Sequence, residues 1–382
     1  MLFLVLKEVI TIKKILFGIT SLTLGGAERV LVDISNKLSE KYDITIFSIY
    51  DNGELKNDLN KNVKFKALYN CRYDELTKLQ KMWIPIKILL FSKIIYNKKI
   101  KQNYDTEIAF LEGPITRLFS TKNKDVHKIA WIHNDIEKVF GNDLKSKIKK
   151  YIDKNIYKKY NDLVFVSQDN MEKFQNIYND LNTENMHVIY NYIDKDLVIK
   201  KSNYNIKVEF DYNSINFLTV CRLVKQKAID RFIRVHSKLI KRGLKHKVYI
   251  IGDGPEKENL KKLIKQENVE DTFILLGKKE NPYPYIKNAN YFCLLSEFEG
   301  YGMVLEEAKI LNKPIIITNT AARECIENYP KALILENSED EIYDGLYKLL
   351  NDNDDKIFNN TQTNTEYDNT EKLQKIIELV GD

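Results

Sequence analysis

The 382-residue sequence predicts an α/β protein built from two doubly wound, Rossmann-like domains. Short apolar runs rich in β-branched residues alternate with amphipathic stretches of helical period, as in residues 15–19 followed by 27–38. Continuous apolar strands flanked by helices are typical of parallel sheets buried on both faces. Twelve such runs are too many for one open sheet of ordinary width, and the chain is too long for one ordinary domain.

The predicted boundary lies near residue 196, inside the polar and weakly periodic stretch 194–211. In the first domain, 1–196, we expect strands at 15–19, 44–49, 107–111, 128–131, 163–166 and 187–189. In the second, 197–382, we expect strands at 217–220, 247–251, 272–276, 291–295, 314–318 and 332–335. The polar stretch 351–369 is predicted to be a loop. The final amphipathic helix, 371–380, can extend the second domain or pack back on the first.

Composition favours a globular protein with full hydrophobic cores, because 43% of residues are hydrophobic and 30% are charged. The four cysteines are scattered and show no zinc-ligand spacing, which suits a reducing compartment. The apolar N-terminus has neither a basic region before it nor a cleavage site after it, so we interpret it as an extension ahead of the first strand. No run reaches the length of a membrane-spanning helix. We therefore expect a cytoplasmic protein.

The segment 296–308, SEFEGYGMVLEEA, carries the clearest chemical signal and directly follows a predicted strand. Gly300 and Gly302 allow a tight turn, and a helix is predicted to begin near Met303, where free N–H groups suit an anion or a sugar hydroxyl. Glu299 and Glu307 could each accept hydrogen bonds from a diol. Because ligands bind beyond the carboxyl ends of strands in open α/β sheets, we expect this segment to line a central cleft between the two domains.

The spacing Glu299-x7-Glu307, with EGYG and EEA around it, resembles the motif of the retaining GT-B glycosyltransferases of family 4, the glycosyl transferases group 1, of the capsule and cell-surface polysaccharide type. Residues 220–227, VCRLVKQK, resemble the GRL–K segment of the same family. The resemblance implies that Arg222 and Lys227 bind the diphosphate of a nucleotide-sugar donor. Two fixed cations would offset the charge that develops on the leaving diphosphate.

The sequence departs from that family pattern at two positions. Cys221 stands where glycine is usual, and Ala228 stands where glycine normally follows the lysine. Both side chains are small, so we expect function to survive.

Further segments extend the resemblance over most of residues 14–340. IGDGP at 251–255 would turn a loop toward the cleft, and 276–286 resembles the loop that holds the nucleobase. GGAER, from Gly25, resembles the donor-side glycine loop, and the motif at 191–194 resembles the domain hinge. The resemblance implies catalytic roles for His133, Glu299, Arg222 and Lys227. It implies donor contacts for Gly25, Gly26, Arg222, Lys227, Gly252, Gly254, Glu299, Gly300, Tyr301, Gly302, Met303 and Glu307.

No Asp-x-Asp motif follows a predicted strand, and the letters at 352–354 lie in the polar tail. We therefore expect no metal or cofactor, with Arg222, Lys227 and helix N-termini taking the place of a divalent cation. The resemblance implies a hexosyl transfer with retention by front-face attack, from a UDP-sugar to a glycan or lipid-linked acceptor. A sugar-nucleotide epimerase and a non-catalytic nucleotide-sugar-binding partner of a transferase are the alternatives.

Two lysine-rich stretches suggest an anionic membrane surface as a further partner. Residues 78–101 hold seven lysines among bulky apolar residues and no acidic residue, and 144–160 hold seven lysines with one acidic residue, Asp153. A core helix with a solvated lysine face is an equally weighted alternative. Nucleic acid is not expected, because arginines are few there and no recognition motif is present. The expected location is the cytoplasm, with peripheral attachment to the inner face of the plasma membrane as an option.

Overall fold

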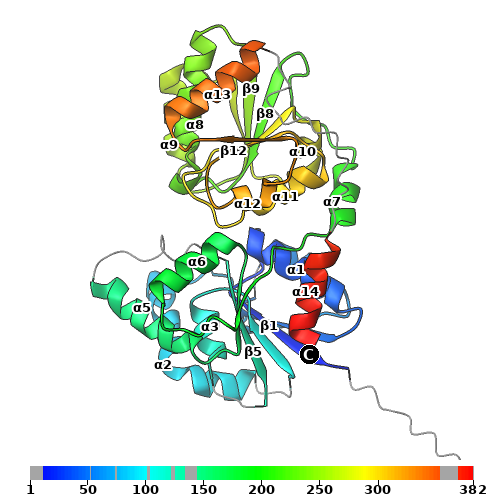
Figure 1. Cartoon of the computed structure of the whole chain (residues 1–382), viewed down its shortest axis with the longest axis vertical. Coiled ribbons are helices and arrows are strands. Elements are labelled where there is room, and N and C mark those ends of the chain that lie inside the picture. The colour runs from blue at the N-terminus through cyan, green and yellow to red at the C-terminus, as the bar shows by residue number, and fades with distance from the viewer. Residues whose placement is uncertain are drawn as a thin grey trace, which may run out of the picture. The chain divides into compact units, whose positions relative to one another are not determined.

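The computed structural model describes residues 12–51, 53–73, 75–100, 104–121, 125–133, 144–352 and 369–381. The chain forms two compact units, the first comprising Met1–Tyr192 with Asn369–Asp382 and the second Ile193–Asp368. The division falls four residues before the predicted boundary at 196. Each unit is a parallel sheet with helices packed around it (Figure 1).

The sheet of the first unit has the strand order β3-β2-β1-β4-β5-β6-β7, and all its pairings are parallel. Its strands are β1 (Lys14–Ile19), β2 (Asp43–Tyr50), β3 (Lys64–Tyr69), β4 (Thr106–Ala109), β5 (His127–Ile132), β6 (Asp162–Phe165) and β7 (Met186–Val188). Its helices are α1 (Gly26–Leu38), η1 (Glu54–Asp58), α2 (Lys78–Lys99), α3 (Pro114–Phe119), α5 (Leu144–Tyr157), α6 (Gln168–Ile177) and α14 (Thr370–Gly381).

The sheet of the second unit has the order β10-β9-β8-β11-β12-β13, again all parallel. Its strands are β8 (Ile215–Val220), β9 (His246–Ile251), β10 (Phe273–Gly277), β11 (Tyr291–Leu294), β12 (Ile315–Thr318) and β13 (Ala332–Leu335). Its helices are α7 (Lys195–Ser202), η2 (Lys225–Lys227), α8 (Ile229–Lys241), α9 (Lys257–Glu267), α10 (Tyr283–Asn288), α11 (Met303–Ile310), α12 (Arg323–Ile326) and α13 (Glu339–Asp352).

Both sheets have the Rossmann order 3-2-1-4-5-6, to which the first adds β7 at one edge. The predicted class of two doubly wound α/β domains is therefore confirmed. Strand β3 was missed because its sequence, KFKALY, alternates lysines with apolar residues and lies half-buried at the sheet edge. The polar stretch 194–211, in which the domain boundary was predicted, contains α7, whose first turn is capped by Asp194 accepting from the N–H of Leu197 at 2.9 Å.

Helix α14 belongs to the first unit although it lies at the far end of the chain. Lys13 Nζ donates to the carbonyl of Gly381 at 2.6 Å, and the hydroxyl of Thr106 donates to the carbonyl of Val380 at 3.4 Å. Ile376 and Val380 are fully buried. Of the polar tail predicted at 351–369, residues 353–368 lie outside the described residues, as do 353 and 354 of the Asp-x-Asp letters and residues 1–11 of the N-terminal extension.

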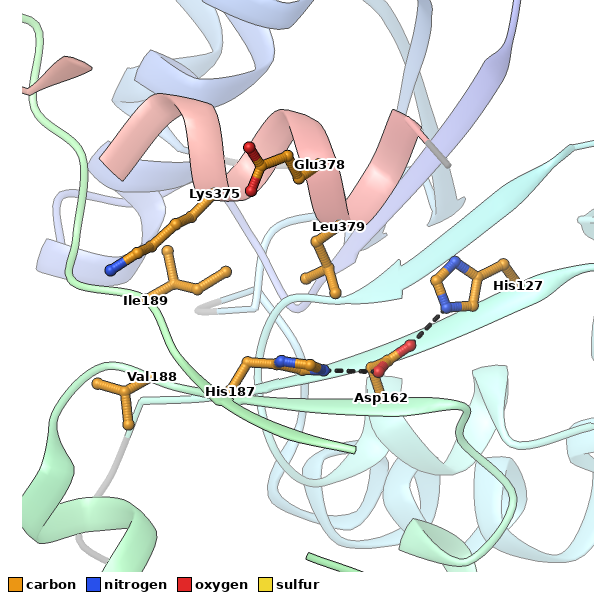
Figure 2. A pocket seen from close by; sticks show the side chains of 8 residues that line it. All are labelled: His127, Asp162, His187, Val188, Ile189, Lys375, Glu378 and Leu379. Carbon is orange, nitrogen blue, oxygen red and sulfur yellow. Dashed lines mark hydrogen bonds and ion pairs between the residues drawn. The ribbon is translucent and has the colours of Figure 1, made fainter. Parts of the chain in front are cut away.

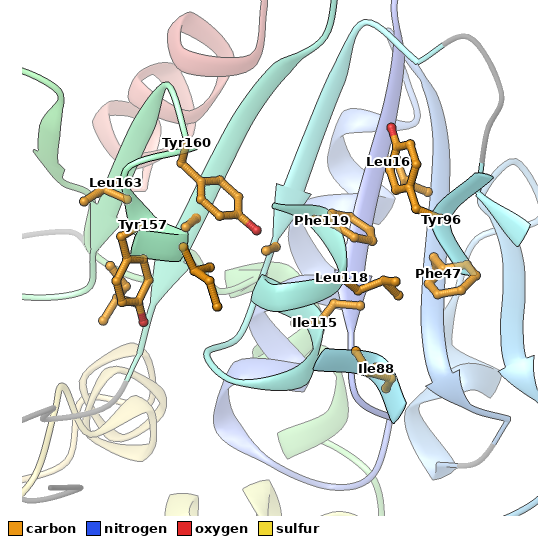
Figure 3. Packing of buried hydrophobic residues seen from close by; sticks show 14 of the residues in the cluster. Leu16, Phe47, Ile88, Tyr96, Ile115, Leu118, Phe119, Tyr157, Tyr160 and Leu163 are labelled. Carbon is orange, nitrogen blue, oxygen red and sulfur yellow. The ribbon is translucent and has the colours of Figure 1, made fainter. Parts of the chain in front are cut away.

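Each unit has its own hydrophobic core. In the first, aromatic residues of β2 and α3 pack with tyrosines of α2 and α5, among them Phe47, Phe119, Tyr96 and Tyr157 (Figure 3). A buried ion pair lies against this core: Lys128 Nζ is 2.6 Å from Glu107 Oε2, and the hydroxyl of Tyr96 donates to the other oxygen of Glu107. In the described residues no helix is long and apolar enough to cross a membrane.

Candidate functional site

The candidate site of the second unit lies where the strand order reverses. Strand β8 pairs with β9 on one side and β11 on the other, so the loops after β8 and β11 leave the sheet side by side. In open α/β sheets this topological switch point is where ligands bind. The loop after β8 carries Arg222 and Lys227, and the loop after β11 carries Glu299 and the glycine turn. The topology thus brings the two strongest sequence motifs together.

Lys227 and Glu299 form an ion pair at this point. Lys227 Nζ is 2.5 Å from Glu299 Oε1, and the hydroxyl of Ser296 donates to the same oxygen at 2.5 Å. The Glu299 side chain is 7% exposed and that of Lys227 is 18% exposed. The resemblance implies that Lys227 binds the diphosphate and that Glu299 contacts the donor, and in the structure the two side chains pair with each other. A ligand here would meet a cation and a carboxylate that are already in place.

The two loops are also joined through their backbones. The N–H of Glu297 donates to the carbonyl of Gln226 at 2.9 Å, and the side-chain amide of Gln226 donates to the carbonyl of Phe298 at 2.9 Å. Gln226 and Ser296 were not predicted as site residues, because their roles depend on which strands are neighbours.

Arg222 is the exposed cation of the site. Within the described residues its guanidinium has no ion-pair or hydrogen-bond partner. An exposed guanidinium with its N–H donors available suits bidentate binding of a phosphate.

Ala228, directly after Lys227, adopts a left-handed conformation with φ 48° and ψ 37° and is 2% exposed. This is the position where the resembling family has glycine, which adopts such a conformation without steric cost. Ala228 is also the N-cap of α8, so this turn fixes the point on the backbone from which the Lys227 side chain projects. The departure at this position therefore carries conformational strain that the small size of alanine does not remove.

Gly252 and Gly254 have a structural reason for lacking a side chain. A Cβ on Gly252, where φ is +148°, would lie 1.8 Å from the carbonyl oxygen of Cys221, and a Cβ on Gly254 would lie 2.3 Å from that of Leu223. The N–H groups of Cys221 and Leu223 donate to carbonyls of the β9 strand and loop at 3.0 Å each. The predicted donor contacts of these glycines are untested. Burial raises the pKa of the Cys221 thiol to about 12, so it stays protonated at neutral pH.

The glycine turn before α11 leaves several donors available. Gly302 is the left-handed N-cap of α11, with φ 75° and ψ 62°. Across the described residues, the backbone N–H groups of Glu299, Gly300, Gly302 and Met303 donate to no other residue. Free N–H groups at a helix start suit an anion or a hydroxyl oxygen. Tyr301 is buried and points its hydroxyl at Glu306, a contact that sequence reasoning missed.

Glu307 lies on α11 and is half-buried. Its Oε1 accepts a hydrogen bond of 3.2 Å from the hydroxyl of Tyr283 on α10. Tyr283 was not predicted as a site residue. The loop at 276–286 resembles the nucleobase loop. In it, Asn281 donates to the carbonyl of Lys201 at 2.8 Å and Tyr285 donates to Glu209 at 2.5 Å, so both side chains make hydrogen bonds within the unit. The nucleobase assignment stays a prediction.

The predicted residues of the first unit lie at the carboxyl edge of its own sheet. Gly25 is the N-cap of α1 and Gly26 its first residue. Gly25 has an extended backbone that any residue adopts, but a Cβ there would lie 2.2 Å from Oε2 of Glu28. The Glu28 side chain thus folds back over the glycine pair, and burial raises its pKa.

His133 follows β5 and is held on two sides. Its backbone N–H donates to Oε1 of Glu112 at 2.8 Å, and its ring packs on Phe110 with centroids 4.7 Å apart. Burial lowers the pKa of His133 to about 3, so the imidazole is neutral at physiological pH. Among the described residues its Nε2 atom has no hydrogen-bond partner. Asn134 and Asp135, which follow His133 in the sequence, lie outside the described residues.

A separate pocket of about 490 Å³ lies at the opposite, amino edge of the first sheet, beneath α14 (Figure 2). His127 and His187 both bond to Asp162 there, at 2.5 and 2.7 Å. Because ligands of open sheets bind at the carboxyl edge, this cluster is not part of the candidate site. Over the described ranges, no group of three or more His, Cys, Asp or Glu side chains has the geometry to hold a metal ion.

The fold and this site define a class: two Rossmann-like parallel α/β domains, as in GT-B glycosyltransferase structures, with charged groups at a switch point. Solved structures support the fold. The Anabaena protein HepE, crystallised with UDP and glucose, has a TM-score of 0.74 at 16% identity, covering 97% of this chain and 99% of that one. The protein TarM has a TM-score of 0.71 at 17% identity, covering 98% and 99%.

Sequence comparison gives a match to a family model and to whole-length relatives. Residues 200–367 match the family Glycosyl transferases group 1. The chain is 28% identical over 342 residues to the Campylobacter jejuni N-acetylgalactosamine-N,N'-diacetylbacillosaminyl-diphospho-undecaprenol 4-alpha-N-acetylgalactosaminyltransferase, covering 87% of this chain and 89% of that protein. It is 24% identical to the Escherichia coli O-antigen biosynthesis glycosyltransferase WclY, covering 80% of each.

Proposed function

We propose that this protein is a glycosyltransferase that moves a sugar from a nucleotide-sugar donor to a glycan or lipid-linked acceptor in cell-surface polysaccharide synthesis. The observation that carries the proposal is the Lys227–Glu299 pair beside the exposed Arg222, at the switch point of the sheet in the region that matches Glycosyl transferases group 1. The names of the Campylobacter and Escherichia relatives support an acceptor of this kind.

In this proposal the diphosphate of the donor binds between Arg222 and Lys227. Lys227 keeps Glu299 on one side and gains a phosphate oxygen on the other, while Arg222 supplies a second cation. The free N–H groups of the glycine turn face the sugar, and Glu307 accepts from the ribose hydroxyls. Because HepE was crystallised with UDP-glucose, UDP-sugars are the first donors to test.

Transfer would then need no metal, because the two cations offset the charge that the diphosphate gains as it leaves. We propose retention of the anomeric configuration, with the sugar transferred as a hexosyl group, in line with the family 4 and capsule-type resemblance. Gly25 and Gly26 are proposed to contact the donor, and His133 is proposed to act at the donor sugar. A neutral His133 would offer a hydrogen bond to a sugar hydroxyl instead of a charge. Activity in EDTA and the anomeric proton coupling of the product test these two points.

We also propose that α2 attaches the protein to an anionic membrane surface at the inner face of the plasma membrane. Its first turn contains no acidic residue, and Ile84, Ile88 and Tyr96 point into the core of the first unit. Leu89 and Ile95 are partly buried against the same core. Seven other bulky apolar side chains of α2 are 38–68% exposed: Leu79, Met82, Trp83, Ile86, Leu90, Phe91 and Ile94. An exposed apolar face flanked by lysines suits a bilayer rich in anionic lipid.

Vesicle sedimentation tests this attachment. We expect binding to phosphatidylcholine vesicles containing phosphatidylglycerol, weaker binding to pure phosphatidylcholine, and a loss of at least fivefold in the double variant Leu79→Ser with Leu90→Ser. Tyr212→Ser is the matched control, because Tyr212 and Leu90 are both 68% exposed and Tyr212 lies in the second unit. Wild-type protein that stays in the supernatant with anionic vesicles would contradict the proposal.

A donor panel tests the main proposal. Purified protein is given UDP-, GDP- and dTDP-sugars, and nucleotide release is measured with and without a polyprenyl-diphosphate-linked acceptor. We expect release that depends on the acceptor. Conversion of one sugar nucleotide into another without transfer would favour an epimerase. Tight binding without any turnover would favour a non-catalytic partner of a transferase.

A further inference from the structure

The glycine turn between β11 and α11 is held by side chains more than by its backbone. Its first residues are tied to the neighbouring loop by the bonds between Gln226 and residues 297–298, and its end is tied by the N–H of Leu305 donating to Gly302 at 2.8 Å. Between these points the N–H groups of Glu299 and Gly300 make no bond to any residue that the structure describes. The shape of the turn must therefore depend on side-chain contacts.

Two such contacts flank Gly300. On one side Glu299 is bound by Lys227 and Ser296. On the other side the Tyr301 side chain turns into the protein, and its hydroxyl donates to Oε1 of Glu306, one turn into α11. Tyr301 is 5% exposed and Glu306 is 1% exposed. Gly300 thus lies between two side chains that are both anchored in the interior.

Glu306 is connected to α12 through Lys309. Its Oε2 is 3.3 Å from Nζ of Lys309, and the same Nζ donates to the carbonyl of Cys325 at 2.6 Å. These contacts form a continuous series: Tyr301 of the turn bonds to Glu306, Glu306 pairs with Lys309, and Lys309 bonds to Cys325.

A carboxylate is a costly choice for this buried position. Burying a charge is unfavourable unless partners compensate, and an apolar side chain of similar volume is often as stable or more stable. Stability alone therefore does not account for Glu306. The directed bond to Tyr301 does, because it fixes one orientation of the turn that carries the free N–H groups.

We infer that Glu306 is a positioning residue for donor binding: through Tyr301 it holds the backbone of residues 300–303 in the shape that receives the nucleotide-sugar. This inference rests on the proposed function of the same site. Glu306 acts through Tyr301 and the turn, without touching the donor.

The test compares Tyr301→Phe, Glu306→Leu, their double variant and Glu306→Gln with the wild type. The measurements are the KM for the donor and kcat from nucleotide release, the Kd for UDP by calorimetry, the thermal midpoint, and hydrogen exchange of the peptide covering 297–304. Tyr329→Phe is the matched control. It removes a bond of the same kind in the same unit, from the Tyr329 hydroxyl to the carbonyl of Lys313 at 2.8 Å, away from the turn.

We expect Tyr301→Phe and Glu306→Leu each to raise the donor KM about tenfold with a smaller change in kcat, and to speed exchange in 297–304. The double variant should lose no more than the worse single variant, because both remove the same contact. Glu306→Gln keeps an acceptor for the tyrosine hydroxyl and should stay within about threefold of the wild-type KM. The thermal midpoint of the double variant should not fall, because it leaves neither a buried carboxylate nor a buried hydroxyl without its partner.

Unchanged KM, UDP affinity and exchange in both single variants would overturn the inference. Equal losses in Tyr329→Phe, or a loss that follows the thermal midpoint, would show a structural role only and would overturn it as well. Wild-type protein that binds and turns over no sugar nucleotide would refute the proposed function instead, and the exchange measurement would still decide whether Tyr301 and Glu306 hold the turn.

Discussion

Each unit contains a buried or nearly buried lysine–glutamate pair, and the two pairs differ in where they lie. In the first unit Lys128 and Glu107 face each other on adjacent strands, 2.6 Å apart, with side chains 3% and 0% exposed. In the second unit Lys227 and Glu299 lie on loops beyond the strands, 2.5 Å apart, with side chains 18% and 7% exposed. A pair buried within a sheet is inaccessible to ligands and can only stabilise the fold. A pair at the carboxyl edge with an accessible lysine can also bind a ligand, through the free side of the lysine ammonium.

Breaking the pair buried within the first sheet should have the largest effect on stability. In Lys128→Met the carboxylate of Glu107 stays buried without its cation, although Tyr96 still donates to it. We expect a loss of about 3–5 kcal/mol in the free energy of unfolding, measured by urea titration with probes in the first unit. The double variant Glu107→Leu with Lys128→Met should recover most of that loss, because no unpaired charge remains. A single variant as stable as the wild type would refute the structural role of the pair.

Acid should destabilise the second unit through a different buried pair. His236 Nδ1 and His246 Nε2 are 2.8 Å apart, and burial lowers their pKa values to about 2 and about 4. Between pH 6.5 and 4 these two histidines bind protons in the unfolded chain but stay neutral in the folded unit. Their contribution to the free energy of unfolding is therefore fully present above pH 6.5 and is lost as the pH falls. From pH 7 to 5.5 we expect a loss of roughly 2 kcal/mol by urea titration. His246→Gln should show about half of that loss, and a flat profile would contradict the assignment.

Removing proposed donor-binding side chains, Lys227 of the accessible pair and Glu307 of α11, should affect transfer more than folding. We expect Lys227→Ala and Glu307→Ala each to lower kcat/KM for the proposed transfer at least tenfold, which corresponds to about 1.4 kcal/mol in the transition state. Lys225→Ala is the control, because Lys225 lies on the same short helix and is exposed. Unchanged rates in both test variants would refute the site assignment.

The smallest effect should come from the strained residue beside the accessible pair. Ala228→Gly removes the steric cost of the left-handed conformation, against the greater chain entropy of glycine when unfolded. We expect the second unit to gain about 0.5–1 kcal/mol in thermal or urea unfolding. Asn268→Gly should gain less, because Asn268 has φ 56° and asparagine tolerates that region. A loss of stability in Ala228→Gly would show that no strain is stored at this position.

The sequence predicted the fold well where strands are buried on both faces, because such strands are continuous apolar runs. It failed for β3, whose alternating lysines follow from an edge position that only the assembled sheet defines. It located Lys227 and Glu299 as separate motifs but could not pair them, since residues 72 positions apart meet only through the order of β8 and β11. Tyr283, Ser296 and Glu306 lie inside the recognised segments but received no role, because their roles depend on which way a side chain turns at a helix or loop.

The position of α14 has a consequence for how the chain is made. The first unit is built from two stretches separated by the whole of the second unit, and the helix that completes it leaves the ribosome only after the second unit. Domains generally fold as they are synthesised, so the second unit can finish folding while the first still lacks α14, the helix that carries the buried Ile376 and Val380. During that interval the apolar surface that receives α14 is open to water. Chaperone binding to nascent chains should therefore persist until α14 emerges, long after the first sheet has been translated.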